Sequence, residues 1–253
     1  MITESFDNLT EAIIDPKRSD HAPKVDACII TFSYKIRDFV LQNYECKEIA
    51  RDASTCGQTP IYGLGFNGKK FAFLMSFIGA PAAVGTVEGA RVLLNCDKFI
   101  AFGGAGCLNK EIARGKVMVP TAAYRDEGTS YHYVPAADYI TLKNSCKVAA
   151  FMEEYGIPYV LGKTWTTDAI FRETRGNFEK RKAEGCISVE METAGLQAVC
   201  DFRGLEFYNF LTSGDLLDAP KWDMRIKEGQ IRGTQHDAGH FNIALMLADY
   251  VTR

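Results

Sequence analysis

The stretch "ISVEMETAGLQAVCDFRG", residues 187–204, decides the fold. Its β-branched start at 187–189 is typical of the end of a buried strand, and a helical pattern runs through the rest of the stretch. Between strand and helix, Glu190 and Glu192 flank Met191. A chain usually buries aliphatic groups at such a junction, so the two carboxylates indicate a chemical role.

Strand-like and helix-like segments alternate on either side of this junction. Apolar runs predict strands at 25–32, 98–106, 115–124, 158–168, 186–190 and 205–215, and a hairpin over 61–78 that turns at Asn67-Gly68. Helical periodicity predicts helices at 35–44, 81–96, 138–156, 191–203 and 237–253, and in part at 171–185. This order predicts an α/β fold with one mixed central sheet flanked by helices. Polar residues 1–24 are expected to form an N-terminal arm, and 25–253 a single domain without internal repeats.

The composition favours a protein that acts on small metabolites. The chain has 253 residues, 47% of them hydrophobic, and a formal net charge of -3 without a basic stripe, so nucleic acid is not the expected partner. None of the eight cysteines forms a CxxC pair, which favours buried reduced thiols over a metal cluster. The first 21 residues lack the features of a signal peptide, and no apolar run reaches the roughly 20 residues that span a bilayer. We therefore expect a cytoplasmic protein that does not bind membranes.

Five polar or glycine-rich segments follow the predicted strands. They lie at 103–106, 124–133, 166–172, 190–192 and 213–218. Ligands of open α/β folds bind at the carboxyl ends of strands, so these segments are the first candidates for a site. The segment "GGAG" does not match GxGxxG, and no metal, flavin or nicotinamide is indicated.

The carboxylates at the junction allow two interpretations. Acidic residues are favoured in the first turn of a helix, which would make both structural. Alternatively, a carboxylate can accept two hydrogen bonds at once and so bind the neighbouring hydroxyls of a sugar, with the thioether of Met191 as an apolar floor.

Several motifs carry a family resemblance. The sequence "VEMETAG" (189–195) resembles a signature of the nucleoside phosphorylase family, which includes uridine phosphorylases, hexameric purine nucleoside phosphorylases and methylthioadenosine nucleosidases. The segments 66–83, 98–133, 162–173 and 210–218 are also similar to that family, and the resemblance spans about residues 25–250. It implies a nucleoside phosphorylase-like fold and an oligomer built from dimers, with a hexamer as one form.

The resemblance also implies roles for individual residues. Met191 and Glu192 match the pair that contacts the ribose, and Glu190 is a weaker candidate for the same role. Asp215 falls where purine-specific members keep an Asp, although an extra Gly leaves its register relative to Asp218 open. As a general acid it would protonate N7 of a leaving purine; the alternative is a helix cap.

The base-binding loop follows at 170–172. Ile170 and Phe171 match the pair that stacks on the base, and both could instead be core residues. Arg172 could bind carbonyl oxygens of a pyrimidine, or could simply be solvated. The preference between purine and pyrimidine therefore stays open.

The phosphate site departs from the family pattern. Phe32 falls at the expected glycine, Ile36 at one expected arginine and Ala101 at another. Backbone N–H groups of Gly103 and Gly104 could still form an anion-binding nest, with Lys35, Arg37 or Arg172 as the positive charge.

Our first hypothesis is cleavage of the N-glycosidic bond of a purine or pyrimidine nucleoside, with inorganic phosphate as co-substrate and without a cofactor. The alternatives are hydrolysis of the same bond and a nucleoside-binding protein with little turnover. Cleavage passes through a sugar with oxocarbenium character, as in glycoside hydrolysis, so a carboxylate at the 2′ hydroxyl would bind the transition state more strongly than the substrate.

Overall fold

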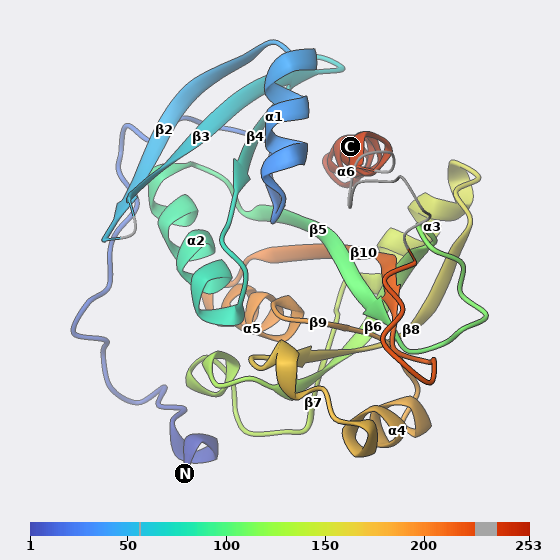
Figure 1. Cartoon of the computed structure of the whole chain (residues 1–253). Helices are drawn as coiled ribbons and strands as arrows, with labels where there is room; N and C mark the ends of the chain where they lie inside the picture. The colour runs from blue at the N-terminus through green and yellow to red at the C-terminus, as the bar shows by residue number, and fades with distance from the viewer. Residues whose placement is uncertain (56, 226–236) are drawn as a thin grey trace.

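The computed structural model describes residues 1–55, 57–225 and 237–253, with the side chains of residues 237 and 238 left out. Within these residues, ten strands form one mixed sheet (Figure 1). The strands are β1 (Ala27–Thr31), β2 (Cys46–Ser54), β3 (Gly57–Phe66), β4 (Lys69–Met75), β5 (Lys98–Cys107), β6 (Val117–Asp126), β7 (Tyr139–Thr141), β8 (Tyr159–Thr167), β9 (Cys186–Glu190) and β10 (Glu206–Leu216). The predicted α/β fold with a mixed sheet is confirmed.

The helices cover both faces of the sheet. They are α1 (Tyr34–Asn43), α2 (Ala80–Leu93), α3 (Ser145–Glu154), α4 (Arg175–Ala183), α5 (Thr193–Arg203) and α6 (Asp237–Val251), with short 3-10 helices η1 (Ile2–Glu4), η2 (Thr129–His132) and η3 (Ile170–Arg172). Side chains alternate across β1: Cys28 and Ile30 pack with α2 and α5, whereas Ala27 and Ile29 pack with α1, α3 and α6. All four residues are fully buried, as a central strand covered on both faces requires.

Part of the sheet closes into a ring. β5 pairs in parallel with β10, β10 pairs with β6, β6 with β8, β8 with β9, and β9 returns antiparallel to β5. The contact between β9 and β5 covers only Gly106–Val189 and Cys107–Ser188. This short return brings the junction that follows β9 to the middle of β5 rather than to its end.

Two sequence predictions were wrong in detail. β2 was not predicted, because its sequence CKEIARDAS is charged and mostly exposed and is held by pairing with β3 alone. The helix expected over 138–156 begins only at Ser145, since Tyr139–Thr141 pair with β6 as β7. The hairpin turn is confirmed, with φ of +50° at Asn67 and +78° at Gly68.

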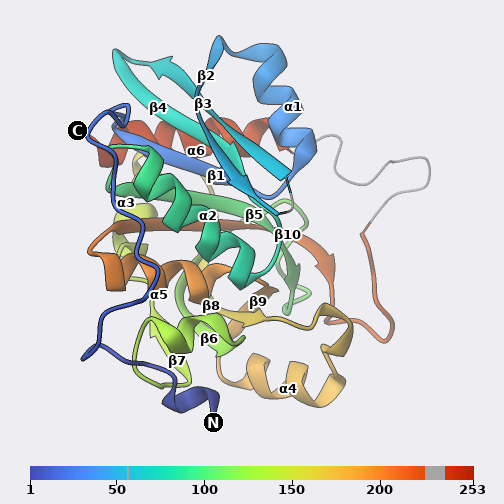
Figure 2. The same ribbon diagram turned by 90° about the vertical axis from the view of Figure 1, so that its left-hand side faces the viewer.

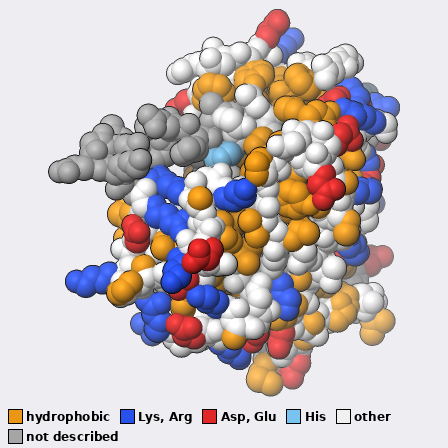
Figure 3. All heavy atoms as spheres, turned by 90° about the vertical axis from the view of Figure 1, so that its right-hand side faces the viewer, with side chains coloured by type: hydrophobic (Ala, Val, Ile, Leu, Met, Phe, Trp, Pro, Cys, Tyr) orange, Lys and Arg blue, Asp and Glu red, His pale blue; other side chains and the backbone are white. Residues whose placement is uncertain are grey.

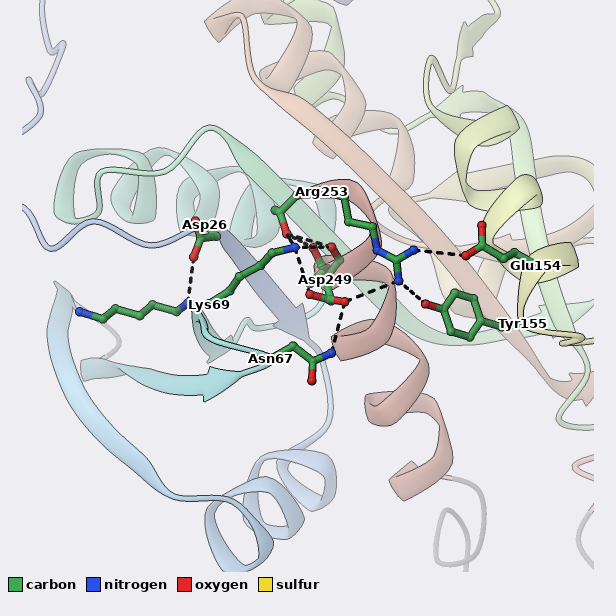
Figure 4. Close-up of polar contacts among 10 residues, drawn as sticks. Asp26, Asn67, Lys69, Glu154, Tyr155, Asp249 and Arg253 are labelled. Carbon is green, nitrogen blue, oxygen red and sulfur yellow. Dashed lines mark hydrogen bonds and ion pairs between the residues drawn. The ribbon is translucent and has the colours of Figure 1, made fainter.

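Helix α6 is fastened to this hairpin by a polar network at its last turns (Figure 4). The Lys69 ammonium lies 3.0 Å from the Asp249 carboxylate, and the side-chain amide of Asn67 donates to the same carboxylate at 3.3 Å. Arg253 reaches across to Glu154 at the end of α3, at 3.2 Å. The network therefore joins β4, α3 and α6 at one end of the sheet.

The N-terminal segment lies along α2 and α5 (Figure 2). After η1 it has no helix or strand up to residue 23, and then Lys24 forms a bridge with Asn95. Arg91 and Arg203 both contact the Asp15 carboxylate, at 3.8 and 3.0 Å, and so tie the segment to the two helices. Acidic and basic side chains are interspersed on the face drawn in Figure 3. Among the described residues, no helix is both long and apolar enough to cross a bilayer.

Candidate functional site

The candidate site lies along one edge of β5, where two neighbouring strands leave a gap. β1 pairs with β5 as far as Phe102, and β9 pairs with the same edge from Gly106 onward. Between these positions, no strand among the described residues pairs with that edge. Backbone groups in such a gap need partners from solvent or from a ligand. The gap is bordered by the end of β1 on one side and by residues 190–192 on the other.

Glu190, the last residue of β9, is buried and holds the start of α5 in place. One carboxylate oxygen accepts from the backbone N–H groups of Glu192 and Thr193, both at 2.7 Å. The other accepts from the hydroxyl of Thr166 at 2.5 Å, and that hydroxyl accepts from the backbone N–H of Ala194 at 3.1 Å. The interpretation of an acidic residue at a helix start therefore applies to Glu190. Ribose hydroxyls would have to displace protein donors to bind it as predicted.

Glu192 has a different environment. It is 9% exposed, and one of its oxygens accepts from the backbone N–H of Gly79, at the start of α2, at 2.7 Å. The other accepts from the backbone N–H of Met191, a half-buried residue, at 3.2 Å. Burial and the negative charge of Glu190 raise the pKa of Glu192 to about 7. Its carboxylate has no side-chain donor among the described residues, so it keeps acceptor capacity for hydroxyl groups.

A β-bulge aims Asp215. The register of β10 against β5 shifts between Ser213 and Leu216, and a Cβ on Gly214 would lie 3.2 Å from the Ala105 carbonyl oxygen. Gly214, the extra glycine of the motif, therefore lies at the bulge, where β10 approaches β5 closely. A bulge interrupts the regular alternation of side chains along a strand, so the Asp215 side chain does not follow the alternation of the preceding residues of β10.

The two oxygens of Asp215 have separate surroundings. One accepts from the indole N–H of Trp222 at 2.6 Å, and the other lies 3.8 Å from where a Cβ on Gly106 would be. Asp218, the alternative, instead accepts from the Lys182 ammonium at 2.9 Å. Asp215, rather than Asp218, therefore lies beside Gly106, where the pairing of β5 with β9 begins.

The predicted base-binding residues are exposed on η3. Ile170 is 49% and Phe171 93% exposed, and Arg172 is also exposed, so none of them is a core residue. The next residue, Glu173, is half-buried, and burial together with the charge of Asp215 raises its pKa to about 7. Glu173 therefore joins Asp215 as a second titratable group on this side of the site.

The predicted anion nest is not formed. Gly103 and Gly104 continue β5 in register with Leu211 and Thr212 of β10, without the positive φ angles that a nest requires. Phe32 packs over Gly103, 3.3 Å from a Cβ built there, whereas Gly104 is exposed and has open space beside it. Gly104 is therefore open at the unpaired edge, whereas Gly103 is covered.

Positive potential reaches this place from α1. The helix begins directly after β1 with Ser33 as its N-cap, whose hydroxyl accepts from the backbone N–H of Ile36 at 3.4 Å. Lys35 lies in the first turn. Arg37 is bound to the neighbouring Asp38 carboxylate at 2.7 Å, which neutralises the nearest arginine. The dipole at the N-terminus of α1 remains as an attraction for an anion.

One of the five polar segments does not join the site. The guanidinium of Arg125 donates to Ser130 at 2.8 Å and to the Pro135 carbonyl at 2.7 Å, which folds the segment after β6 onto itself. His132 lines a separate groove between the N-terminal segment and helices α2 and α5. β6 runs parallel to β8 and pairs with it as far as Thr167, so the contacts of Arg125, and not the strand direction, set the path of the residues that follow β6.

Sequence reasoning missed four residues that shape the site. They are Gly79, Thr166, Glu173 and Trp222. The Gly79-Ala80-Pro81 helix start and the polar end of β8 were visible signals for the first two. Nothing local connects Trp222 to Asp215, because the contact depends on the path of the loop between them.

Comparison with known proteins places the chain in a family. Residues 27–235 match the model of the phosphorylase superfamily. A DeoD-type purine nucleoside phosphorylase of Bacillus subtilis is 25% identical over 186 residues, covering 71% of this chain and 76% of that protein. A uridine phosphorylase of Salmonella typhimurium is 26% identical over 155 residues, covering 55% and 61%.

A similar fold occurs in a solved structure. The crystal structure of AMP nucleosidase from Bacteroides thetaiotaomicron VPI-5482 superimposes with a TM-score of 0.69 and 16% identity, covering 90% of this chain and 88% of that one. At this identity the likeness concerns the fold alone.

Proposed function

The chain belongs to the phosphorylase superfamily, and we propose that it cleaves the N-glycosidic bond of a nucleoside with inorganic phosphate as the acceptor. The superfamily relatives that it matches include purine nucleoside phosphorylases and a uridine phosphorylase. The proposal assigns the ribose to Glu192 and Met191, the base to Asp215 and the η3 residues Ile170, Phe171 and Arg172, and the phosphate to the open edge of β5 at Gly104.

The geometry of Glu192 carries this proposal. Its carboxylate is buried and fixed by two backbone N–H groups from different elements, and it borders an unpaired strand edge. Such a group is ready to accept from two neighbouring ribose hydroxyls. As the sugar becomes cationic, these bonds strengthen, and the transition state is bound more tightly than the nucleoside.

The leaving base requires a proton or a hydrogen bond. Asp215 supplies an oxygen next to the gap, and Glu173, with a pKa of about 7, can carry a proton at neutral pH. Either carboxyl could donate to a purine nitrogen. The exposed Phe171 offers an aromatic face for the base.

The group that accepts the pentose distinguishes two reactions: phosphate gives phosphorolysis, and water gives hydrolysis. The exposed Gly104 and the N-terminus of α1 support phosphate. Hydrolysis is the second candidate, because Arg37 is already paired with Asp38 and Phe32 covers Gly103, which leaves fewer groups for a dianion.

One assay separates these outcomes. The protein is incubated with a panel of purine and pyrimidine nucleosides, with and without inorganic phosphate, and the base and the pentose product are measured. Release of base with ribose 1-phosphate, dependent on phosphate, is expected. Release of base with free ribose at the same rate in both conditions would assign hydrolysis, and saturable binding without any release would leave a nucleoside-binding protein.

We also propose a homo-oligomer built from dimers. Phe77 and Ile78, directly before the Gly79 contact to Glu192, are 55% and 64% exposed. A second copy that covers them would enclose the ribose side of the site. Sedimentation analysis tests this proposal: a monomer at micromolar concentration would contradict it.

A further inference from the structure

Trp222 is the second member of a hydrogen-bonded pair with Asp215. Its indole N–H donates to one oxygen of the carboxylate at 2.6 Å. The other oxygen lies on the side of Gly106, close to the β5 gap. The indole N–H can only donate, so the oxygen that it contacts is an acceptor, and a proton that Asp215 transfers to the base has to be carried by the other oxygen.

The loop that carries Trp222 has a defined shape. Leu216 and Asp223 exchange two backbone hydrogen bonds, at 2.7 and 3.2 Å, and so close residues 217–222 into a compact turn. The guanidinium of Arg175, on α4, donates to the carbonyls of Leu217 at 3.2 Å and Ala219 at 2.7 Å.

A second anchor from α4 is the contact between Lys182 and Asp218, at 2.9 Å. Backbone hydrogen bonds that close the turn and side chains from α4 therefore both hold residues 217–222 in place. Trp222 is 61% exposed all the same, so its ring is not needed to fill the core. An exposed tryptophan on an anchored turn, bonded to the carboxylate at the base side of the site, indicates a role in the site.

We propose that Trp222 is a positioning residue that orients the Asp215 carboxylate toward the base of the nucleoside. This inference rests on the proposed function. A carboxylate on a bulged strand can rotate about its side-chain torsions, and the indole N–H selects the orientation in which one oxygen points to the gap. The position of this oxygen matters because proton transfer to the base requires hydrogen-bond geometry.

A double-mutant cycle tests the proposal. Trp222→Phe keeps an aromatic ring and removes the N–H, and Asp215→Asn removes the charge that the N–H orients. Hydrogen bonds to charged groups have strengths that correspond to roughly 10- to 100-fold in rate, so kcat of Trp222→Phe should fall by about that factor. KM should change by less than about threefold, because the contact affects proton transfer more than ground-state binding.

The decisive comparison is in the Asp215→Asn background. There, adding Trp222→Phe should change kcat by less than about twofold, because an amide has no acid proton to transfer, whatever its orientation. An equal loss in both backgrounds, or no loss from Trp222→Phe alone, would overturn the proposal. A merely structural role for Trp222 would lower the activity in both backgrounds alike.

Fluorescence tests the contact without turnover. The chain has two tryptophans, and Trp165 is 1% exposed, so quenching by acrylamide reports mainly on Trp222. Asp215→Asn should change the emission of the wild-type protein and leave that of Trp222→Phe unaltered. If the wild-type protein released no base, the proposed function would fail. The fluorescence comparison would then test the contact by itself, and an unchanged wild-type emission after Asp215→Asn would overturn the role of Trp222.

Discussion

The Glu192 carboxylate accepts a hydrogen bond from the backbone N–H of Gly79 at 2.7 Å, across 113 positions of the chain. This contact joins the N-termini of α2 and α5 at the unpaired edge of β5. It fixes a buried carboxylate whose pKa is raised to about 7. The predictions below follow from this arrangement and from the elements that support it.

Replacing Glu192 by Gln should weaken nucleoside binding and stabilise the fold. Its pKa is about 7 in the folded protein and near 4.3 in an unfolded chain, so the folded state loses stability as pH rises through this range. Glu192→Gln should therefore raise the melting temperature by roughly 2–6 °C at pH 8, and by less at pH 5. Nucleoside binding should weaken by about 100-fold. Calorimetric unfolding at both pH values and a binding titration measure the two effects.

Glu190→Gln is the matched control for that variant. Its amide oxygen can still accept from the backbone N–H groups of Glu192 and Thr193, while its amide NH2 faces the Thr166 hydroxyl. Nucleoside binding should change by less than about fivefold. Equal losses in the two variants would show that the junction as a whole, rather than Glu192, matters.

Nucleoside affinity should depend on pH. Ribose hydroxyls donate best to the ionised carboxylate, and about a tenth of Glu192 is ionised at pH 6 compared with about nine tenths at pH 8. The dissociation constant should therefore be about tenfold higher at pH 6 than at pH 8. Isothermal titration calorimetry over this pH range measures the change in the dissociation constant. Tighter binding at pH 6 would contradict a carboxylate acceptor.

Gly106 should resist any side chain. A Cβ there would lie 2.8 Å from both Leu217 and Val189, so Gly106→Ala should destabilise the protein by about 1–3 kcal/mol. Gly104→Ala is the matched control, since a Cβ at Gly104 meets nothing within 4 Å. Denaturant unfolding of both variants tests this; the same loss of stability in each would count against the close packing of Leu217 and Val189 on Gly106.

The network at α6 should affect stability without affecting the reaction. Asp249→Ala leaves the part-buried Lys69 ammonium without its carboxylate, and the free energy of unfolding should fall by about 1–3 kcal/mol. The control is Glu48→Gln, which breaks the more exposed pair with Arg51 and should cost less than about 1 kcal/mol. The reaction at 25 °C should be unchanged in both variants, so a specific loss of kcat in Asp249→Ala would contradict this separation.

The sequence predicted the elements with strong local patterns. β1, β5 and β9 have apolar runs, and the Asn67-Gly68 turn has a backbone requirement that few residue pairs meet. β2 escaped prediction because its stability comes from a neighbouring strand and not from its own apolar pattern. The start of α3 was misplaced because Tyr139–Thr141 suit both a strand and a helix until pairing with β6 decides.

The site was predictable to the extent that one short motif encodes it. Glu190 and Glu192 look equivalent in the sequence, but the folded chain gives Glu190 four donors from nearby residues and leaves Glu192 with two backbone donors. The anion nest failed because glycine permits positive φ without requiring it, and strand pairing kept Gly103 and Gly104 extended. Trp222 depends on a long-range contact that no local pattern shows.

The most direct test compares a ribonucleoside with its 2′,3′-dideoxy analogue, titrated calorimetrically into the wild-type protein and into Glu192→Gln. The wild-type protein should bind the ribonucleoside at least about 100-fold more tightly, because the analogue cannot donate the two hydroxyl hydrogen bonds to the buried Glu192 carboxylate. Glu192→Gln should lose most of this preference. Equal affinity of the wild-type protein for both compounds would contradict the assignment of Glu192 to the ribose hydroxyls.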